Sequence, residues 1–325
     1  MKSANSRRAG WFGAVVAVAA PLAAMAQAYP SKPVHLLVGF TGGSTSDVIG
    51  RVVAQKLAEG LGQTVVVENR PGAGANIAAE VVAKAAPDGY TALYANTGIA
   101  VAISAYSKLG YDVLRDLAPV GQAAASPHIL VVGMSLPVQS VKDLIVLAKG
   151  KPGALNVAST GSGNSDHFAY ELFRSMTGAE MVHIVYKGGP QAMIDVMSGQ
   201  VAAYFAGMAV ALPLARAGKT KALAVTSGQR SPMAPDIPTM GEAGLPGYEH
   251  LLWNAIFVPA ATPKDIIARL DAELVKAVNS PDVRERFAAL GAEPASRTSE
   301  QMAAYLRSEI DKYGKIVRAI GLKID

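Results

Sequence analysis

The chain has 325 residues, carries 30 Lys and Arg against 25 Asp and Glu, and contains no cysteine. Its length suits two domains with a sizeable core, and a charged fraction of 17% with a mean hydropathy of +0.25 excludes a disordered chain. The absence of cysteine excludes disulfides, thiolate nucleophiles and cysteine-based zinc or iron–sulfur sites.

The first 26 residues predict a secretory signal peptide. Lys2, Arg7 and Arg8 form a basic start, an apolar run follows over 11–24, and small residues precede a cleavage site after Ala26 or, two residues later, after Ala28. The apolar run is shorter than the ~20 residues that span a bilayer, which disfavours a membrane anchor. Removing these residues takes away three basic groups and no acid, leaving 27 against 25, so the net charge falls from +5 to +2. The mature protein is therefore expected to be exported.

Beyond residue 29, apolar runs rich in β-branched residues alternate with amphipathic helical segments. Strands are predicted over 34–38, 64–68, 90–95, 129–132, 155–159, 181–186, 201–205 and 221–226. Capping signals begin the C-terminal helices: Thr262 and Ser280 each precede a proline, and Thr298 pairs with Gln301. Four prolines predict an extended surface loop over 231–246. The alternation predicts an α/β fold of two lobes, each a mainly parallel sheet flanked by helices, with a cleft between them.

Several familiar chemistries are excluded by spacing. Gly218-Lys219-Thr220 lacks the upstream glycine of a phosphate-binding loop, and Gly72-Ala73-Gly74 lacks the third glycine of a dinucleotide fingerprint. Ser165-Asp166-His167 are adjacent on a predicted helix, where neighbouring side chains do not face each other, so they cannot relay a proton as a triad. The five histidines show no metal-ligand spacing, and no basic stripe indicates nucleic acid. We therefore predict no enzyme activity, cofactor, metal site or nucleic-acid partner.

Two of the strand-to-helix junctions share an unusual composition. The segments 40–46 and 160–165 are rich in glycine and hydroxyl groups, and neither contains Lys or Arg. Glycine lets backbone N–H groups approach a ligand, and a helix N-terminus carries about half a positive charge. Because ligands of open α/β sheets bind at the carboxyl ends of strands, the two loops are predicted to clamp an anion, most simply a carboxylate, from both lobes. Asp47 and Asp166 are expected to stabilise the following helices without needing to touch the ligand.

Five segments carry a resemblance to a known family. They are Val66-Val67-Glu68-Asn69-Arg70-Pro71-Gly72-Ala73-Gly74, Ala86-Pro87-Asp88-Gly89-Tyr90-Thr91, Tyr186-Lys187-Gly188, Leu223-Ala224-Val225-Thr226-Ser227 and Glu242-Ala243-Gly244-Leu245-Pro246-Gly247-Tyr248. From Tyr29 to its C-terminus, the chain resembles the Bug (Bordetella uptake gene) family, the extracytoplasmic solute-binding receptors of tripartite tricarboxylate transporters.

The resemblance implies a fold similar to type II periplasmic binding proteins, with lobe 1 over 29–127 and 251–325 and lobe 2 over 128–250. It implies a carboxylate ligand held largely by backbone amides and ordered water, and delivery to integral membrane transporter subunits. We also expect a monomer. The ligand-binding residues expected on this basis and from the two loops are Phe40, Thr41, Gly43, Ser44, Ser46, Thr97, Thr160, Gly161, Asn164, Ser165, His167 and Phe205.

The chain departs from the family pattern at a few positions. Gly39 stands where the family usually has proline, so a different loop backbone is expected, and the stretch 102–106 is shorter. Ala206 stands where many members have aspartate, which argues against an amino-acid ligand. Two other functions stay open: a carboxylate-sensing input protein for a membrane signalling kinase, and a hydrolase with Ser165 as nucleophile.

Overall fold

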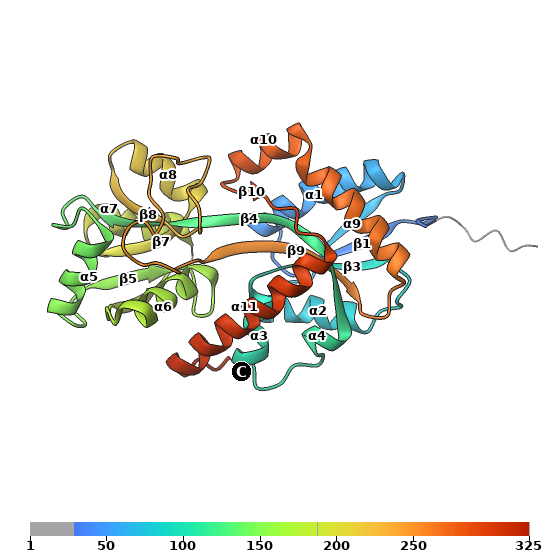
Figure 1. The fold of residues 1–325 in the computed structure, drawn as a ribbon, viewed down its shortest axis with the longest axis horizontal. Coiled ribbons are helices and arrows are strands. Elements are labelled where there is room, and N and C mark those ends of the chain that lie inside the picture. The colour runs from blue at the N-terminus through green and yellow to red at the C-terminus, as the bar shows by residue number, and fades with distance from the viewer. Residues whose placement is uncertain (1–28, 187, 325) are drawn as a thin grey trace, which may run out of the picture.

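The computed structural model describes residues 29–186 and 188–324, and the predicted signal peptide lies outside them. Two bodies of sheet and helix lie side by side, connected by long strands that run from one to the other (Figure 1). None of the helices in the described part of the chain combines the length and the apolar character needed to cross a bilayer.

The first body is a sheet with helices on both faces. Its elements are β1 (Val34–Val38), α1 (Thr45–Leu61), β2 (Val65–Asn69), the 3-10 turn η1 (Ala73–Ala75), α2 (Asn76–Ala83), β3 (Thr91–Asn96), α3 (Gly98–Ala105), α4 (Val113–Asp116), β9 (Leu251–Pro259), α9 (Lys264–Asn279), α10 (Pro281–Ala289), β10 (Glu293–Pro294) and α11 (Ser299–Ile320). β1 pairs in parallel with β2 and β3, whereas β9 runs antiparallel to β3.

The second body is built in the same way. Its elements are α5 (Val141–Gly150), β5 (Asn156–Ser159), α6 (Ser165–Thr177), β6 (Val182–Val185), α7 (Gly189–Ser198), β7 (Ala203–Gly207), α8 (Met208–Arg216) and β8 (Thr220–Val225). β5 pairs in parallel with β6 and β7. The two-lobe α/β fold is therefore confirmed, although each sheet also contains antiparallel strands.

β4 (Leu117–Gly133) passes through both sheets. Its first part pairs antiparallel with β9, down to Pro127 opposite Leu251, and its second part pairs with β7 from His128 opposite Gly207. The predicted strand over 129–132 is thus only the end of a 17-residue strand. Because the partners of β4 change between residues 127 and 128, we propose that this point is the lobe boundary, with the chain returning at 250–251.

The buried side chains form separate clusters in the two lobes. One pair of clusters contains the fully buried Tyr94 and Trp253, and the other pair contains Phe173 and Tyr204. An exception is Phe168 of α6, which packs with the first lobe against Tyr313, with ring centroids 5.3 Å apart. The lobes therefore have their own cores and touch at α6 and α11.

Two of the predicted capping positions are confirmed, whereas Thr262 and one loop differ from prediction: α9 begins at Lys264 after Pro263, and the buried Thr262 hydroxyl makes no capping hydrogen bond among the described residues. Thr298 and Gln301 form a reciprocal capping box at the start of α11, and Ser280 precedes α10 with proline at the first helical position. The segment 231–246 contains no helix or strand, as predicted, but it does not lie wholly on the surface. Ala234 and Met240 are completely buried, because the segment covers the second lobe's core.

Candidate functional site

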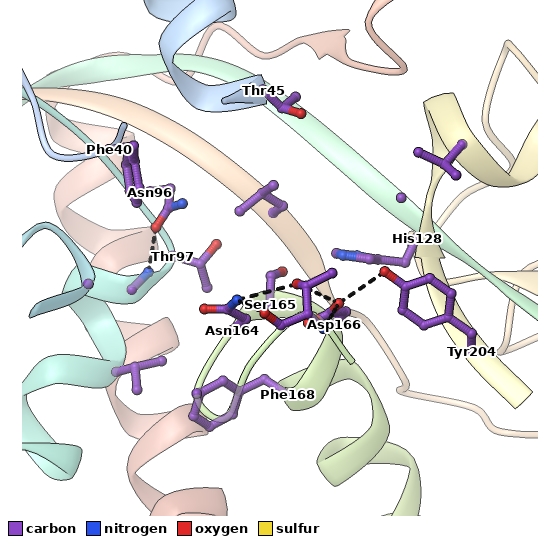
Figure 2. Close-up of a pocket in the computed structure, with 18 residues that line it drawn as sticks. Phe40, Thr45, Asn96, Thr97, His128, Asn164, Ser165, Asp166, Phe168 and Tyr204 are labelled. Atoms are coloured by element: carbon purple, nitrogen blue, oxygen red, sulfur yellow. Dashed lines mark hydrogen bonds between the residues drawn. The ribbon is translucent and has the colours of Figure 1, made fainter. Parts of the chain in front are cut away.

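A cavity of about 340 Å³ lies between the lobes. Residues from both lobes surround it, and Figure 2 shows the polar side chains directed toward the same space. Its lining residues are Phe40, Thr45, Gly74, Asn96, Thr97, Gly98, Val101, His128, Thr160, Gly163, Asn164, Ser165, Asp166, Phe168, Tyr204, Gly207, Val210 and Leu252. This volume is within the usual range for small-molecule sites.

The N-termini of four helices meet at this cavity. Thr45 begins α1, Thr97 is the N-cap of α3, Asn164 is the N-cap of α6, and Gly207 is the N-cap of α8. The side chains of Thr97 and Asn164 make no capping hydrogen bond, and Gly207 has no side chain to make one, although the Gly98 N–H at the start of α3 donates to Asn96 Oδ1 at 2.9 Å. Since helix N-termini present unpaired N–H groups and partial positive charge, the arrangement favours an anion.

No Lys or Arg occurs among the described residues that line the cavity. In the first lobe, the loop before α1 is held by Asp47 and Asn69. The Gly43 N–H donates to Asp47 Oδ2 at 2.8 Å, and the Asn69 side chain donates to Asp47 Oδ1 at 2.7 Å and to the Phe40 carbonyl at 3.0 Å. Arg51 Nε lies 3.1 Å from both Asp47 oxygens, so this carboxylate has an ionic partner.

In the second lobe Asp166 holds the loop before α6 as Asp47 holds the loop before α1, but no Lys or Arg among the described residues forms an ion pair with it. Its Oδ2 accepts hydrogen bonds from the Thr160 N–H at 2.7 Å, the Thr160 hydroxyl at 2.8 Å and the Tyr204 hydroxyl at 3.1 Å. Its Oδ1 accepts from the His167 N–H at 2.9 Å. Burial raises the pKa of Asp166 above its usual value, and these hydrogen bonds partly oppose the shift.

Ser165 connects the lobes through His250. The Ser165 hydroxyl lies 2.8 Å from His250 Nε2, and His250 Nδ1 lies 3.0 Å from the Tyr313 hydroxyl on α11. Burial lowers the pKa of His250 well below its usual value. The second nitrogen of this histidine contacts a phenol, whereas a hydrolase triad would place a carboxylate there. The pair is a structural bridge between α6 and α11.

Five of the twelve residues predicted from the sequence line the cavity: Phe40, Thr97, Thr160, Asn164 and Ser165. The other seven lie outside it. Thr41 and Gly43 are exposed, and Ser44 caps α1 by accepting the Asp47 N–H, while Ser46 is buried in the first turn of that helix.

In the second lobe, Gly161 adjoins the cavity without lining it, and its N–H donates to the Ser159 hydroxyl. His167 stacks on His183 behind the loop, with centroids 4.1 Å apart, and Phe205 is buried against Phe173.

Among the residues that the prediction missed, three come from strands of the second lobe or their ends: His128, Tyr204 and Gly207. Antiparallel pairing of β4 with β7 brings His128 opposite Gly207. Asn96 and Gly98 flank the predicted Thr97, and the Asn-Thr-Gly that ends β3 was the signal for them. Ala206, by contrast, is completely buried and does not line the cavity.

Gly39 is explained by a close approach of two backbones. A Cβ atom at this position would lie 2.2 Å from the Ala75 side chain, which belongs to the turn before α2. Any larger residue would push this turn away from the Phe40 loop. The loop geometry therefore requires glycine here.

The buried histidines predict an acid-sensitive fold. Burial lowers the pKa of His128 from about 6.5 to about 4, so between these values the unfolded chain binds a proton that the folded chain does not. We expect the free energy of unfolding to fall by ~1.4 kcal/mol for each pH unit below 6.5 from this residue. Urea unfolding at pH 7 and pH 5 measures the slope, and His128→Gln should reduce it by that amount. Equal slopes would contradict the assignment.

A two-lobe α/β protein with an interlobe cavity lined by helix N-termini is a solute-binding protein of the periplasmic type. Among the described residues, no group of His, Asp and Glu is placed to hold a metal ion. The family model described as tripartite tricarboxylate transporter family receptor (TctC) matches residues 49–322. The chain belongs to this family.

Its relatives include proteins with bound ligands. Protein BugT of Bordetella pertussis is 38% identical over 317 residues, which cover 97% of each chain. The structure of R. palustris Rpa4515 with adipate is 35% identical, with a TM-score of 0.76 over 91% of this chain and 99% of that one. MatC from Rhodopseudomonas palustris with bound malate is 31% identical, with a TM-score of 0.73 over 89% and 100%. Two of these three relatives are therefore seen with a small organic acid bound.

Proposed function

We propose that this protein captures a small organic carboxylate between its lobes and delivers it to the membrane subunits of a tripartite tricarboxylate-type transporter. It does so in the periplasm, as a monomer, after removal of residues 1–26. The observation that carries the ligand class is the meeting of four helix N-termini at a cavity whose described lining contains no Lys or Arg. Such neutral donors hold an anion and release it when the lobes separate.

The relatives support a dicarboxylate. Adipate and malate, which two related structures contain, are both acids with a carboxylate at each end. In this chain, the polar side chains of Asn96 and Thr97 in the first lobe lie across the cavity from Asn164 and Ser165 in the second lobe (Figure 2). Apolar side chains of Val101, Phe168 and Leu252 line the space between, which suits a short carbon chain.

A binding screen tests this proposal. Purified protein is heated with adipate, malate, succinate, citrate, benzoate and aspartate, and with a sugar and a divalent cation as controls. A ligand at a hundred times its Kd stabilises the fold by ~2.7 kcal/mol, which raises Tm by a few degrees. We expect at least one dicarboxylate to give this shift. A shift with the sugar or the cation, and none with any acid, contradicts the proposal.

Delivery is tested separately from binding. We expect cells that lack this protein to lose uptake of the radiolabelled acid found in the screen. Unchanged uptake, together with loss of an acid-induced transcriptional response, would instead indicate the sensory role.

A further inference from the structure

His128 is the one imidazole among the described residues that line the cavity. It lies on β4 opposite Gly207, and the Thr226 hydroxyl accepts its backbone N–H at 2.8 Å, while its carbonyl accepts the Thr226 N–H at 2.9 Å. The residue is only 5% exposed, and its ring points into the cavity beside Asp166 and Tyr204 (Figure 2). The strand pairing therefore holds the ring in place.

The two ring nitrogens of His128 have different surroundings. Nδ1 is buried and has no hydrogen-bond partner among the described residues, which leaves Nε2 as the nitrogen at the cavity. A neutral imidazole carries one proton, and an unpaired buried N–H is rarer in proteins than an unpaired buried acceptor. The proton of the neutral ring is therefore placed on Nε2.

The groups around His128 keep it neutral. Burial lowers its pKa to about 4, and a charged ring would need an acceptor at Nδ1 that the structure does not offer. Three titratable groups surround the ring: His250, at 5.4 Å between centroids and itself held neutral by burial, Tyr204, and Asp166. Asp166 accepts four hydrogen bonds from other donors, one of them from Tyr204. Beyond His250 lie Tyr313, at hydrogen-bond distance, and Lys312, whose charge further disfavours protonation of His250.

We infer that His128 is a specificity-determining residue, which donates its Nε2–H as a neutral imidazole to a carboxylate oxygen of the ligand. This inference rests on the proposed function and names the side chain that recognises the acid in the second lobe. It explains why the ring points into the cavity although its Nδ1 has no hydrogen-bond partner among the described residues. It also adds a directional donor to the helix N-termini, without a fixed positive charge.

Two variants and the dicarboxylate from the screen test the inference by calorimetry. His128→Leu fills a similar volume with an apolar side chain but removes the N–H donor. We expect the affinity for the dicarboxylate to fall ten- to a hundredfold. His128→Gln places an amide N–H near the same point, and we expect affinity within fivefold of the unchanged protein. Each variant is first checked for the same thermal unfolding as the unchanged protein, because a buried position is altered.

Two measurements on the unchanged protein do not depend on the variants. Between pH 6.5 and 8, calorimetry in buffers of different ionisation enthalpy should show no net proton uptake on binding. Nitrogen-15 NMR of the liganded protein should show a neutral Nε2–H ring for the signal that disappears in His128→Gln.

Unchanged affinity in His128→Leu overturns the inference, and so does uptake of one proton that is lost in His128→Gln. Neither result contradicts the proposed function. Carboxylate capture itself fails if no acid binds the unchanged protein.

Discussion

Gly207→Asp is expected to weaken dicarboxylate binding at least a hundredfold while leaving the fold intact. Gly207 lines the cavity, has an ordinary φ of −57°, and a Cβ atom there would meet nothing within 4 Å. An added carboxylate would lie at the N-terminus of α8 and opposite His128, where we place the ligand's anion. Like charges brought together in a desolvated site cost several kcal/mol, and ~2.7 kcal/mol corresponds to a hundredfold.

The control for this experiment is Gly207→Ser, which adds a neutral side chain of similar size. Aspartate and serine are both good N-cap residues, so both variants should unfold at or slightly above the temperature of the unchanged protein. Calorimetric titration then compares the two. If the aspartate variant binds as tightly as the serine variant, the ligand does not place its charge at α8.

From the sequence alone, Gly161 would be the position chosen to add a repelling charge, rather than Gly207. Gly161 lies in the second glycine-rich loop, but its φ of +153° is unfavourable for other residues, and a Cβ atom would lie 2.8 Å from the Asn164 amide. A substitution there changes the loop as well as the charge. The structure shows that a substitution at Gly207 changes the charge without changing the loop.

Much of the fold was predictable because its signals are local. Apolar runs gave the positions of β1, β2, β3, β5 and β6 to within a few residues, and capping residues gave the starts of α10 and α11. β9 was missed, and β4 was recognised only in part. Both are central strands that pair antiparallel across a sheet, and their pairing joins residues more than a hundred positions apart, such as Pro127 and Leu251.

The site was less predictable for two physical reasons. Its second-lobe wall is formed by the pairing of β4 with β7, which no short pattern around His128 indicates. The amides expected to bind a ligand are also partly used within the protein. The N–H groups of Gly43 and Thr160 donate to Asp47 and Asp166, and a sequence does not show which way these side chains turn.

These two carboxylates differ in one respect that affects binding. Asp47 does not line the cavity and is paired with Arg51, whereas Asp166 lines it and is held by neutral donors. A dicarboxylate must therefore enter a site that already contains one uncompensated negative group. For two unit charges ~10 Å apart at an effective dielectric constant of ~20, the repulsion is ~1.7 kcal/mol.

Asp166→Asn should consequently increase dicarboxylate affinity at pH 7.5 by about tenfold. The asparagine oxygen can still accept from Thr160 and Tyr204, so the loop should keep its shape, with a loss of ~1–2 kcal/mol of stability where its amide faces the His167 N–H. Calorimetry with succinate measures the gain. Aspartate, the same acid with an added ammonium group, is the matched ligand, and its affinity should gain less.

The pH dependence of this gain distinguishes charge from shape. Because burial raises the pKa of Asp166, the unchanged protein loses the repelling charge at a higher pH than an ordinary carboxyl group would. The affinity ratio between the variant and the unchanged protein should therefore shrink as the pH is lowered, and protonation of the ligand itself cancels in this ratio. A ratio that stays constant from pH 7.5 to pH 4.5 would show that the substitution acts by reshaping the loop. In that case the negative charge of Asp166 would play no part in choosing the ligand.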